Sequence, residues 1–296
     1  MNVVGATDIS FSYQIGESEW NMGAKYQLKA VVFDVIEECR ELKKALSEEG
    51  ILVIVPFFGL QVESTLLEML RETELTLGDC LMVTNNDQHA RVATRLGLVT
   101  VGCVEGHFEI PKVDTLLEAP GEVSVCYLNQ VYCHAKGFPA FITETERCII
   151  RELAEEDMDE LYEILTDREV AKYLPVKEGD REEEMEKLIS YVSCVYSFYG
   201  YGYWGVFSRA TGELIGRAGF KEGSYPLEAG YVIKRAEWGK GLATEVLSAL
   251  VQYAEQELDC TEVFVKIDEE NKASARVAQK CGVTMLPACQ EQEENL

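Results

Sequence analysis

Two glycines near the C-terminal end, Gly239 and Gly241, have the spacing of an anion-binding loop. They follow a predicted strand at 228–234 and precede a predicted helix whose apolar residues recur at helical spacing. Glycine lets backbone N–H groups approach an anion closely, because no Cβ stands in the way. The first N–H groups of a helix and the helix dipole favour a phosphate at the same place. The segment therefore predicts a phosphate-binding loop; the alternative is that the glycines only shape a turn.

A second block, Asn271 to Gly282, follows the apolar run Val263–Ile267, which predicts a buried strand. Asn271 and Ser274 open a predicted helix that ends at Gly282. Both side chains can donate hydrogen bonds to a ligand. Asn271 can equally cap the helix and do nothing else.

Together the two blocks resemble the GNAT acetyltransferases, whose loop follows the pattern Gln/Arg-x-x-Gly-x-Gly/Ala. Here Trp238 takes the first position, and Gly241 and Ala243 take the last two. A tryptophan there is similar to the ribosomal-protein N-terminal acetyltransferase branch. The resemblance implies acetyl-CoA as co-substrate, with its pyrophosphate on the loop and its pantetheine arm against the helix that begins at Asn271. The cofactor-binding residues it implies are Val232, Ile233 and Lys234, through their backbone, Trp238, Gly239, Lys240, Gly241, Leu242, Ala243 and Thr244 in the loop, and Asn271 and Ser274.

Glu228 is the candidate general base. The branch often carries Glu-x-Gly-Tyr before the loop, and this chain has Glu228-Ala-Gly-Tyr231. A carboxylate there could take a proton from an amine, directly or through water, or only anchor an ammonium group; an exposed strand-end acid is the third alternative. The tyrosine that many GNAT enzymes use as general acid is absent here, because Ala278 occupies the corresponding position. The group that protonates the thiolate is therefore unassigned.

The resemblance extends upstream to about Glu146. The predicted order is a strand at 147–151, helices at 155–165 and 182–199, strands at 203–208 and 214–219, and the two blocks above. GNAT domains usually carry two more strands at the end, whereas the tail after Gly282 can supply one short strand, interrupted by Pro287. The wall that these strands build for the acceptor is missing, supplied by another chain, or replaced by the N-terminal half. An aromatic cluster either lines an acceptor pocket or packs in the core; it comprises Tyr196, Phe198, Tyr199, Tyr201, Tyr203 and Trp204.

The N-terminal half alternates predicted strands and helices, which is typical of a parallel sheet covered on both faces. The strands lie at 28–34, 51–55, 80–83 and 99–104, and the helices at 35–49, 62–73, 87–96 and 127–136. We place the domain boundary between residues 139 and 140.

This half resembles the haloacid-dehalogenase family, with Val31-Val-Phe-Asp34 at the nucleophile strand and Leu81–Ala90 at the metal loop. The second acid of that family is replaced by Ile36, and Thr84-Asn85 replaces its Gly-Asp. A lone carboxylate cannot both hold Mg²⁺ and attack phosphorus, since the ion needs several oxygen ligands. We therefore expect a catalytically inactive domain, with Asp34 as a polar residue at a strand end.

The amino-acid composition limits the classes of molecule that this protein is expected to bind. A formal net charge of −25 disfavours nucleic acid and anionic membranes and is a mild hint of a cationic acceptor. The ten cysteines are scattered without a Cys-x-x-Cys pair, which indicates reduced thiols rather than zinc ligands or disulfides. No signal peptide or membrane-spanning run is apparent, so we expect a cytoplasmic protein. A homodimer is left open.

These observations predict an α/β protein with a Rossmann-like parallel-sheet domain at 1–139 and a mixed-sheet GNAT-type α+β domain with a shortened C-terminus at 140–296. The expected activity is acetyl-CoA-dependent N-acetyl transfer, without a metal, to a primary amine on a small molecule or at a protein N-terminus. The alternatives are a non-catalytic acyl-CoA-binding or regulatory protein and a phosphatase acting through the first half.

Overall fold

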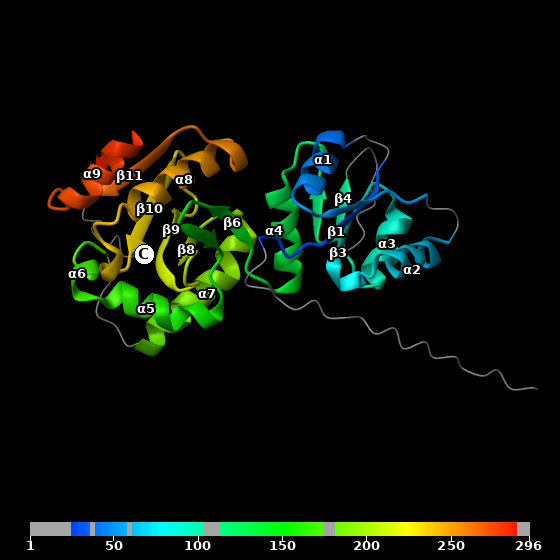
Figure 1. Ribbon diagram of the computed structural model, residues 1–296, viewed down its shortest axis with the longest axis horizontal. Helices are drawn as coiled ribbons and strands as arrows, with labels where there is room; N and C mark the ends of the chain where they lie inside the picture. Colours follow the sequence, from blue (N-terminus) through cyan, green and yellow to red (C-terminus); the bar gives the residue numbers. More distant parts are fainter. Residues whose placement is uncertain (1–24, 36–38, 58–60, 104–112, 175–180, 289–296) are drawn as a thin grey trace, which may run out of the picture. The chain divides into compact units, whose positions relative to one another are not determined.

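The computed structural model describes residues 25–35, 39–57, 61–103, 113–174 and 181–288 (Figure 1). The chain divides between Val125 and Cys126 into two compact units, and each unit is described by itself. Helix α4 (Val125–Lys136) belongs to the second unit, where Gln130 Nε2 donates to the Tyr253 hydroxyl at 3.2 Å. This division lies before the boundary predicted at 139/140, which stays a prediction.

The first unit is a five-stranded, wholly parallel sheet in the order β2-β1-β3-β4-β5. Its strands β3 and β4 are buried along their whole length, as expected of strands covered on both faces. The predicted alternation of strands and helices is confirmed, while β5 was not predicted. The strands are β1 (Ala30–Asp34), β2 (Leu52–Ile54), β3 (Cys80–Thr84), β4 (Val99–Cys103) and β5 (Thr115–Leu117), and the helices are α1 (Arg40–Glu48), α2 (Val62–Thr73) and α3 (Asp87–Arg95).

The second unit is built on a seven-stranded mixed sheet in the order β12-β11-β10-β9-β8-β7-β6. Neighbours from β6 to β10 are antiparallel, whereas β10, β11 and β12 run parallel. The first strand, β6, was not predicted. The strands are β6 (Phe141–Glu144), β7 (Cys148–Arg151), β8 (Tyr203–Ser208), β9 (Leu214–Phe220), β10 (Leu227–Ile233), β11 (Val263–Ile267) and β12 (Thr284–Pro287).

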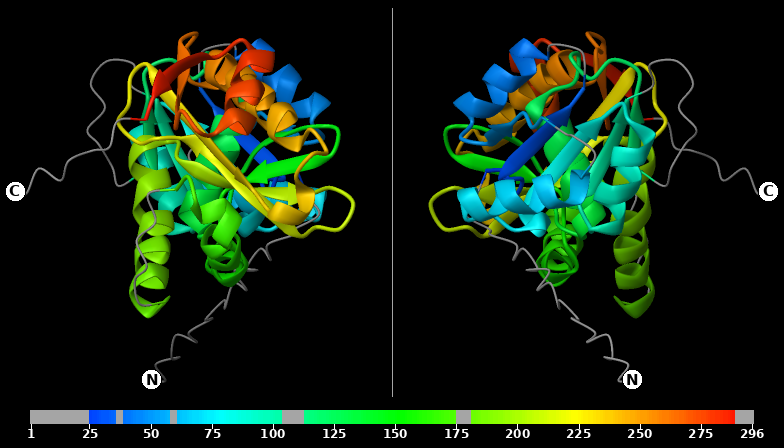
Figure 2. Two further views of the ribbon diagram at one scale, coloured as in Figure 1. Left: turned by 90° about the vertical axis from the view of Figure 1, so that its left-hand side faces the viewer. Right: turned by 90° about the vertical axis from the view of Figure 1, so that its right-hand side faces the viewer.

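Helices cover both faces of this sheet (Figure 1). On one face lie α5 (Met158–Thr166), α6 (Arg168–Ala171) and α7 (Arg181–Tyr199), over a core that includes Phe207 and Val232. On the other lie α8 (Leu242–Glu257) and α9 (Lys272–Cys281), side by side in Figure 2, over a core that includes Trp204 and Phe220. Trp204 is fully buried against Phe220 and Tyr253, so this part of the predicted aromatic cluster packs in the core.

The tail after Gly282 supplies one strand among the described residues. Strand β12 pairs in parallel with β11 from Phe264↔Thr284 to Ile267↔Pro287, and all four of its residues are exposed. Pro287 ends the strand at the edge of the sheet, where its missing N–H leaves no ladder partner unsatisfied.

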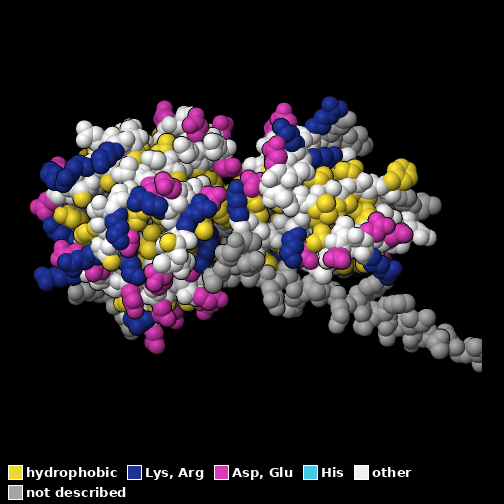
Figure 3. All heavy atoms as spheres, in the orientation of Figure 1, with side chains coloured by type: hydrophobic (Ala, Val, Ile, Leu, Met, Phe, Trp, Pro, Cys, Tyr) yellow, Lys and Arg dark blue, Asp and Glu magenta, His cyan; other side chains and the backbone are white. Residues whose placement is uncertain are grey.

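Charged side chains of both signs are intermixed on the face of the second unit seen in Figure 3. The cysteines within the described ranges are free thiols. In the part of the chain that the structure describes, no helix has the length and apolar character needed to cross a membrane.

Candidate functional site

The sheet of the second unit opens between β10 and β11. These parallel strands pair only at Leu227↔Val263 and Glu228↔Phe264. Beyond Glu228, β10 continues as the antiparallel partner of β9 as far as Ile233↔Gly216, while β11 stays paired with β12. The two strands therefore diverge after Glu228, and the edge of β10 that faces β11 leaves the ladder.

Hydrogen-bond parity decides which backbone groups of β10 face this opening. Lys221 N–H donates to Glu228 O at 2.8 Å, and Lys234 N–H donates to Ile215 O at 2.8 Å. Glu228 and Lys234 therefore direct their backbone groups toward the β9 side. Because direction alternates along an antiparallel strand, Val232 also bonds toward β9, while Tyr231 and Ile233 direct their N–H groups to the opening. By this parity the N–H groups of Val232 and Lys234 are engaged by β9, and those of Tyr231 and Ile233 are left to face the opening. The cofactor-binding roles of Val232, Ile233 and Lys234 stay predictions.

The glycine loop has the geometry that an anion requires. Gly239 and Gly241 have φ of +77° and +84°, which favour glycine, and no atom lies within 4 Å of where a Cβ on Gly239 would stand. Among the described residues, no acceptor is found for the consecutive N–H groups from Gly239 to Ala243; Gly241 is the N-cap of α8. Thr244 differs, because its N–H donates to Gly241 O at 3.2 Å. The loop therefore presents a run of donors at the positive end of a 16-residue helix.

Two side chains brace the loop. Trp238 Nε1 donates to Ile233 O at 2.7 Å, which ties the loop to the end of β10. Lys240 is ion-paired with Glu237 at 2.8 Å. Trp238 thus makes a structural hydrogen bond, while the residue as a whole is 49% exposed.

Arg147 directly precedes β7 and forms hydrogen bonds with the glycine loop and with α8, a role that was not predicted from the sequence. Its Nη1 donates to Lys240 O at 2.8 Å, and its guanidinium pairs with Glu245 of α8. Burial opposes ionisation of Glu245, but hydrogen bonds from Thr145 and Arg147 outweigh it and lower the pKa of the carboxyl. Because the C=O and N–H of a trans peptide point in opposite directions, fixing Lys240 O toward Arg147 turns the Gly241 N–H away from it. Arg147 is 93 residues from Lys240 and 98 from Glu245 in the sequence, so no local spacing could reveal these contacts.

The second block packs beside β10. Asn271 Oδ1 accepts the Ser274 N–H at 3.0 Å, so this oxygen caps α9, the plainer of the two predicted roles. Ser274 O accepts the Tyr231 hydroxyl at 3.3 Å, which links α9 to β10 at the opening. Direct roles of the Asn271 amide and the Ser274 hydroxyl toward a ligand stay predictions.

Glu228 lies where β10 and β11 diverge. Its carboxylate is ion-paired with Lys266 of β11 at 2.9 Å, and the side chain is 15% exposed. Its N–H donates to Ser224 Oγ at 3.0 Å. The carboxylate is thus neither a solvated strand-end acid nor an isolated base, but a fixed negative charge at the start of the opening.

Comparison with known proteins agrees with this geometry. A family model described as an acetyltransferase (GNAT) domain matches residues 147–284. The N-acetyltransferase YnaD of Bacillus subtilis, itself described as uncharacterized, is 30% identical over 141 residues, which are 47% of this chain and 80% of YnaD. The chain belongs to the GNAT acetyltransferase family. YoaA of the same organism, another uncharacterized N-acetyltransferase, is 29% identical over 48% of this chain and 81% of its own length.

Solved structures of GNAT proteins are also similar to the second unit. A GNAT-family acetyltransferase from Bacillus anthracis is 27% identical, with a TM-score of 0.41, over 48% of this chain and 82% of that one. RimL, a ribosomal L7/L12 α-N-protein acetyltransferase solved with coenzyme A, is 19% identical, with a TM-score of 0.43. The match covers 48% of this chain and 82% of the RimL chain. The family match leaves the first unit outside its range, and the haloacid-dehalogenase resemblance of that unit stays a prediction.

The first unit places its own polar group at the carboxyl ends of β1 and β3. Asp34 Oδ2 accepts the Thr84 hydroxyl at 2.6 Å and lies 2.7 Å from His89 Nδ1. Ile36, which stands where the resemblance expects an acid, lies outside the described residues. Within the described ranges, no group of three or more His, Cys, Asp or Glu side chains is placed to hold a metal ion. Asp34 is therefore a polar residue at the end of β1, hydrogen-bonded to Thr84 and His89.

Proposed function

We propose that this acetyltransferase uses acetyl-CoA to acetylate a primary amine, carried by a small molecule or by a protein N-terminus. The observation that carries the proposal is the run of N–H groups from Gly239 to Ala243, which have no acceptor among the described residues and follow the segment where β10 leaves β11. A pyrophosphate suits such a run, because several donors and a helix N-terminus act on the same negative charge. Acetyl-CoA, when bound, supplies the acetyl group as a thioester.

The residues of the opening have separate tasks. The loop binds phosphate, and Arg147 keeps its peptide groups oriented. The N–H groups of Tyr231 and Ile233 face the opening and can polarise a carbonyl oxygen that enters it, which is how preorganised donors lower an acyl-transfer barrier. Asn271 and Ser274 lie at the start of α9, beside the same strand.

Glu228 takes the proton of the attacking amine in this proposal, directly or through water. Its carboxylate is fixed by Lys266, so it needs little reorganisation to meet the acceptor. The ion pair is equally compatible with a second role, in which the carboxylate only anchors an ammonium group of the acceptor. The two roles predict different kinetics.

The test is Glu228→Gln, which keeps the side chain's shape and removes its basicity. A general base predicts a fall in kcat on the order of 10²–10⁴-fold, with acetyl-CoA affinity, measured by calorimetry, unchanged. Wild-type kcat with a raised KM for the amine would make Glu228 an anchor instead. Lys266→Met is the matched control, because it removes the partner and keeps the carboxylate.

The alternative of a non-catalytic acyl-CoA-binding protein predicts acetyl-CoA binding without thiol release on any amine. We place the protein in the cytoplasm, and we assign no catalytic role to the first unit. A screen of amines and peptides for thiol release tests these proposals together.

A further inference from the structure

Arg217 lies in the middle of β9, on the face of the sheet opposite α8 and α9. It pairs with Gly205 of β8 and Val232 of β10. Its neighbour Ala218 packs in the core beneath α8, and successive strand residues point to opposite faces. The arginine therefore shares the face on which Val232 packs against α5.

The guanidinium of Arg217 makes no hydrogen bond or ion pair among the described residues, although the charge of Glu222 acts on it from a longer distance. Its carbon lies 5.2 Å from the centroid of the Tyr203 ring, and no hydrogen bond or ion pair with a described residue involves it. The side chain is only partly exposed, and burial lowers the pKa of the guanidinium. A guanidinium carries five donors, and a largely desolvated one without acceptors is costly. Such a group is suited to receive an anion.

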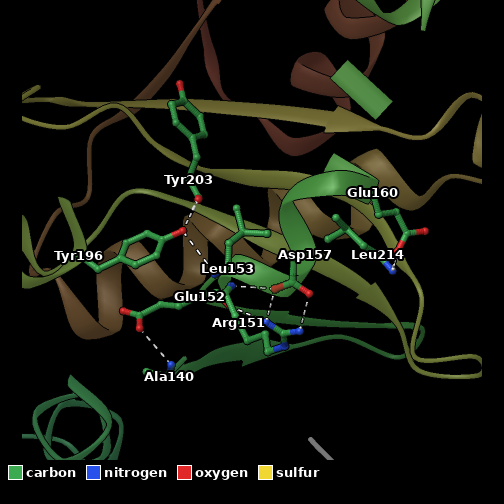
Figure 4. A network of polar contacts seen from close by, with 10 residues as sticks. Ala140, Arg151, Glu152, Leu153, Asp157, Glu160, Tyr196, Tyr203 and Leu214 are labelled. Carbon is green, nitrogen blue, oxygen red and sulfur yellow. Dashed lines mark hydrogen bonds and ion pairs between the residues drawn. The ribbon is translucent and has the colours of Figure 1, made fainter. Parts of the chain in front are cut away.

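The surrounding hydroxyls do not satisfy it. The Tyr196 hydroxyl donates to Tyr203 O at 2.6 Å, and the Tyr191 hydroxyl accepts the Tyr203 N–H at 2.9 Å. Figure 4 shows the Tyr203 side chain directed away from the Tyr196 hydroxyl. Among the described residues, the Tyr203 hydroxyl itself has no hydrogen-bond partner.

Two glycines bring Tyr203 next to the opening. Gly219 and Gly230 pair across β9 and β10, and a Cβ on Gly230 would come within 2.8 Å of the Tyr203 hydroxyl. The ring thus lies across both strands, with its hydroxyl over Gly230, two residues after Glu228. Glu228, Gly230 and Arg217 share one face, because residues two apart on a strand point the same way.

We propose that Arg217, assisted by the Tyr203 hydroxyl, binds an anionic group of the acceptor, so that the acceptor is an amine that also carries a carboxylate or a phosphate. This inference rests on the proposed function, because it places the amine at Glu228. The Tyr203 hydroxyl and Glu228 lie two strand residues apart, which is about 7 Å. The amine and the anionic group are therefore separated by several bonds, as in an ω-amino acid, rather than joined to one carbon. The acidic composition of the whole chain is only a mild hint of a cationic acceptor, and it does not indicate an anionic group on that acceptor.

The experiment compares kcat/KM for matched acceptors with saturating acetyl-CoA. Straight-chain ω-aminocarboxylates and ω-aminoalkyl phosphates of increasing length are measured against alkylamines of the same length. The inference predicts that the wild-type protein prefers an anionic series by roughly tenfold to a hundredfold, the range of a charge-assisted hydrogen bond. The preferred series tells carboxylate from phosphate.

Variants test whether the preference for anionic acceptors depends on Arg217. In Arg217→Met the ratio of anionic to plain amine should fall to about one, Arg217→Lys should keep part of it, and Tyr203→Phe should lower it less. Melting curves and calorimetry with acetyl-CoA show whether each variant is folded. Acetylation of plain amines with no preference for anionic ones, or a preference that survives in folded Arg217→Met, would overturn the inference and leave the proposed function intact. Absence of acetyl transfer to every amine would overturn both.

Discussion

A negative charge introduced at Ala243 should weaken phosphate binding without destabilising the loop, so it distinguishes the two effects. Ala243 lies in the first turn of α8 and has helical geometry, unlike Gly239 and Gly241, where any side chain is strained. In Ala243→Asp the carboxylate stands at the helix N-terminus, which it stabilises by roughly 0.3–1 kcal/mol. The same carboxylate opposes a bound pyrophosphate. Two unit charges about 5 Å apart repel by roughly 0.8 kcal/mol in water and roughly 3.3 kcal/mol at a dielectric constant of about 20.

We therefore expect Ala243→Asp to raise the Kd of acetyl-CoA by about fourfold to a few hundredfold, with a melting temperature unchanged or raised. Ala243→Asn is the matched control, since it has the same size and no charge. Titration calorimetry of both variants at low and high salt measures the difference, which should shrink as salt screens the charges. Equal affinities for the two variants at low salt would refute the assignment of the loop to phosphate.

Three further predictions concern Arg147, His134 and the first unit. Arg147→Met releases Lys240 O, so acetyl-CoA affinity measured by calorimetry should fall several-fold, while affinity for S-acetylpantetheine, which lacks the pyrophosphate, should not; equal losses for both would remove the bracing role. Burial opposes protonation of His134, but the hydrogen bond and charge of Glu152 outweigh it and raise its pKa, so the stabilisation that this pair contributes to the free energy of unfolding should be fully present below about pH 6.5 and decline as the pH rises through the folded-state pKa. Denaturant titrations across this range should show the decline, and His134→Gln should abolish it; an equal decline in the variant would assign it elsewhere. The first unit should hydrolyse no phosphate ester in the presence of Mg²⁺, and turnover that disappears in Asp34→Asn would contradict this.

The sequence predicted what depends on neighbouring residues. The glycine loop, the helix that begins after Asn271 and the position of Glu228 are each encoded within a dozen residues, and the structure places all three around one opening. The short strands β5 and β6 escaped prediction, because three or four residues carry too little periodicity.

What depends on the register of the sheet could not be predicted. One hydrogen bond, from Lys234 N–H to Ile215 O, decides that Tyr231 and not Val232 faces the opening, and a shift by one residue would reverse it. Arg217 is an ordinary strand arginine in the sequence, and only its pairing with Val232 places it on the face that carries Glu228.

The central claim is tested most directly by incubating the purified protein with acetyl-CoA and a library of primary amines, and measuring released coenzyme A thiol and acetylated amine in the same sample. Equal amounts of thiol and acetylated amine are what the proposed function predicts, and the proposed general base predicts that both fall steeply in Glu228→Gln while acetyl-CoA still binds. Tight binding of acetyl-CoA with no acetylated amine from any member of the library would contradict it.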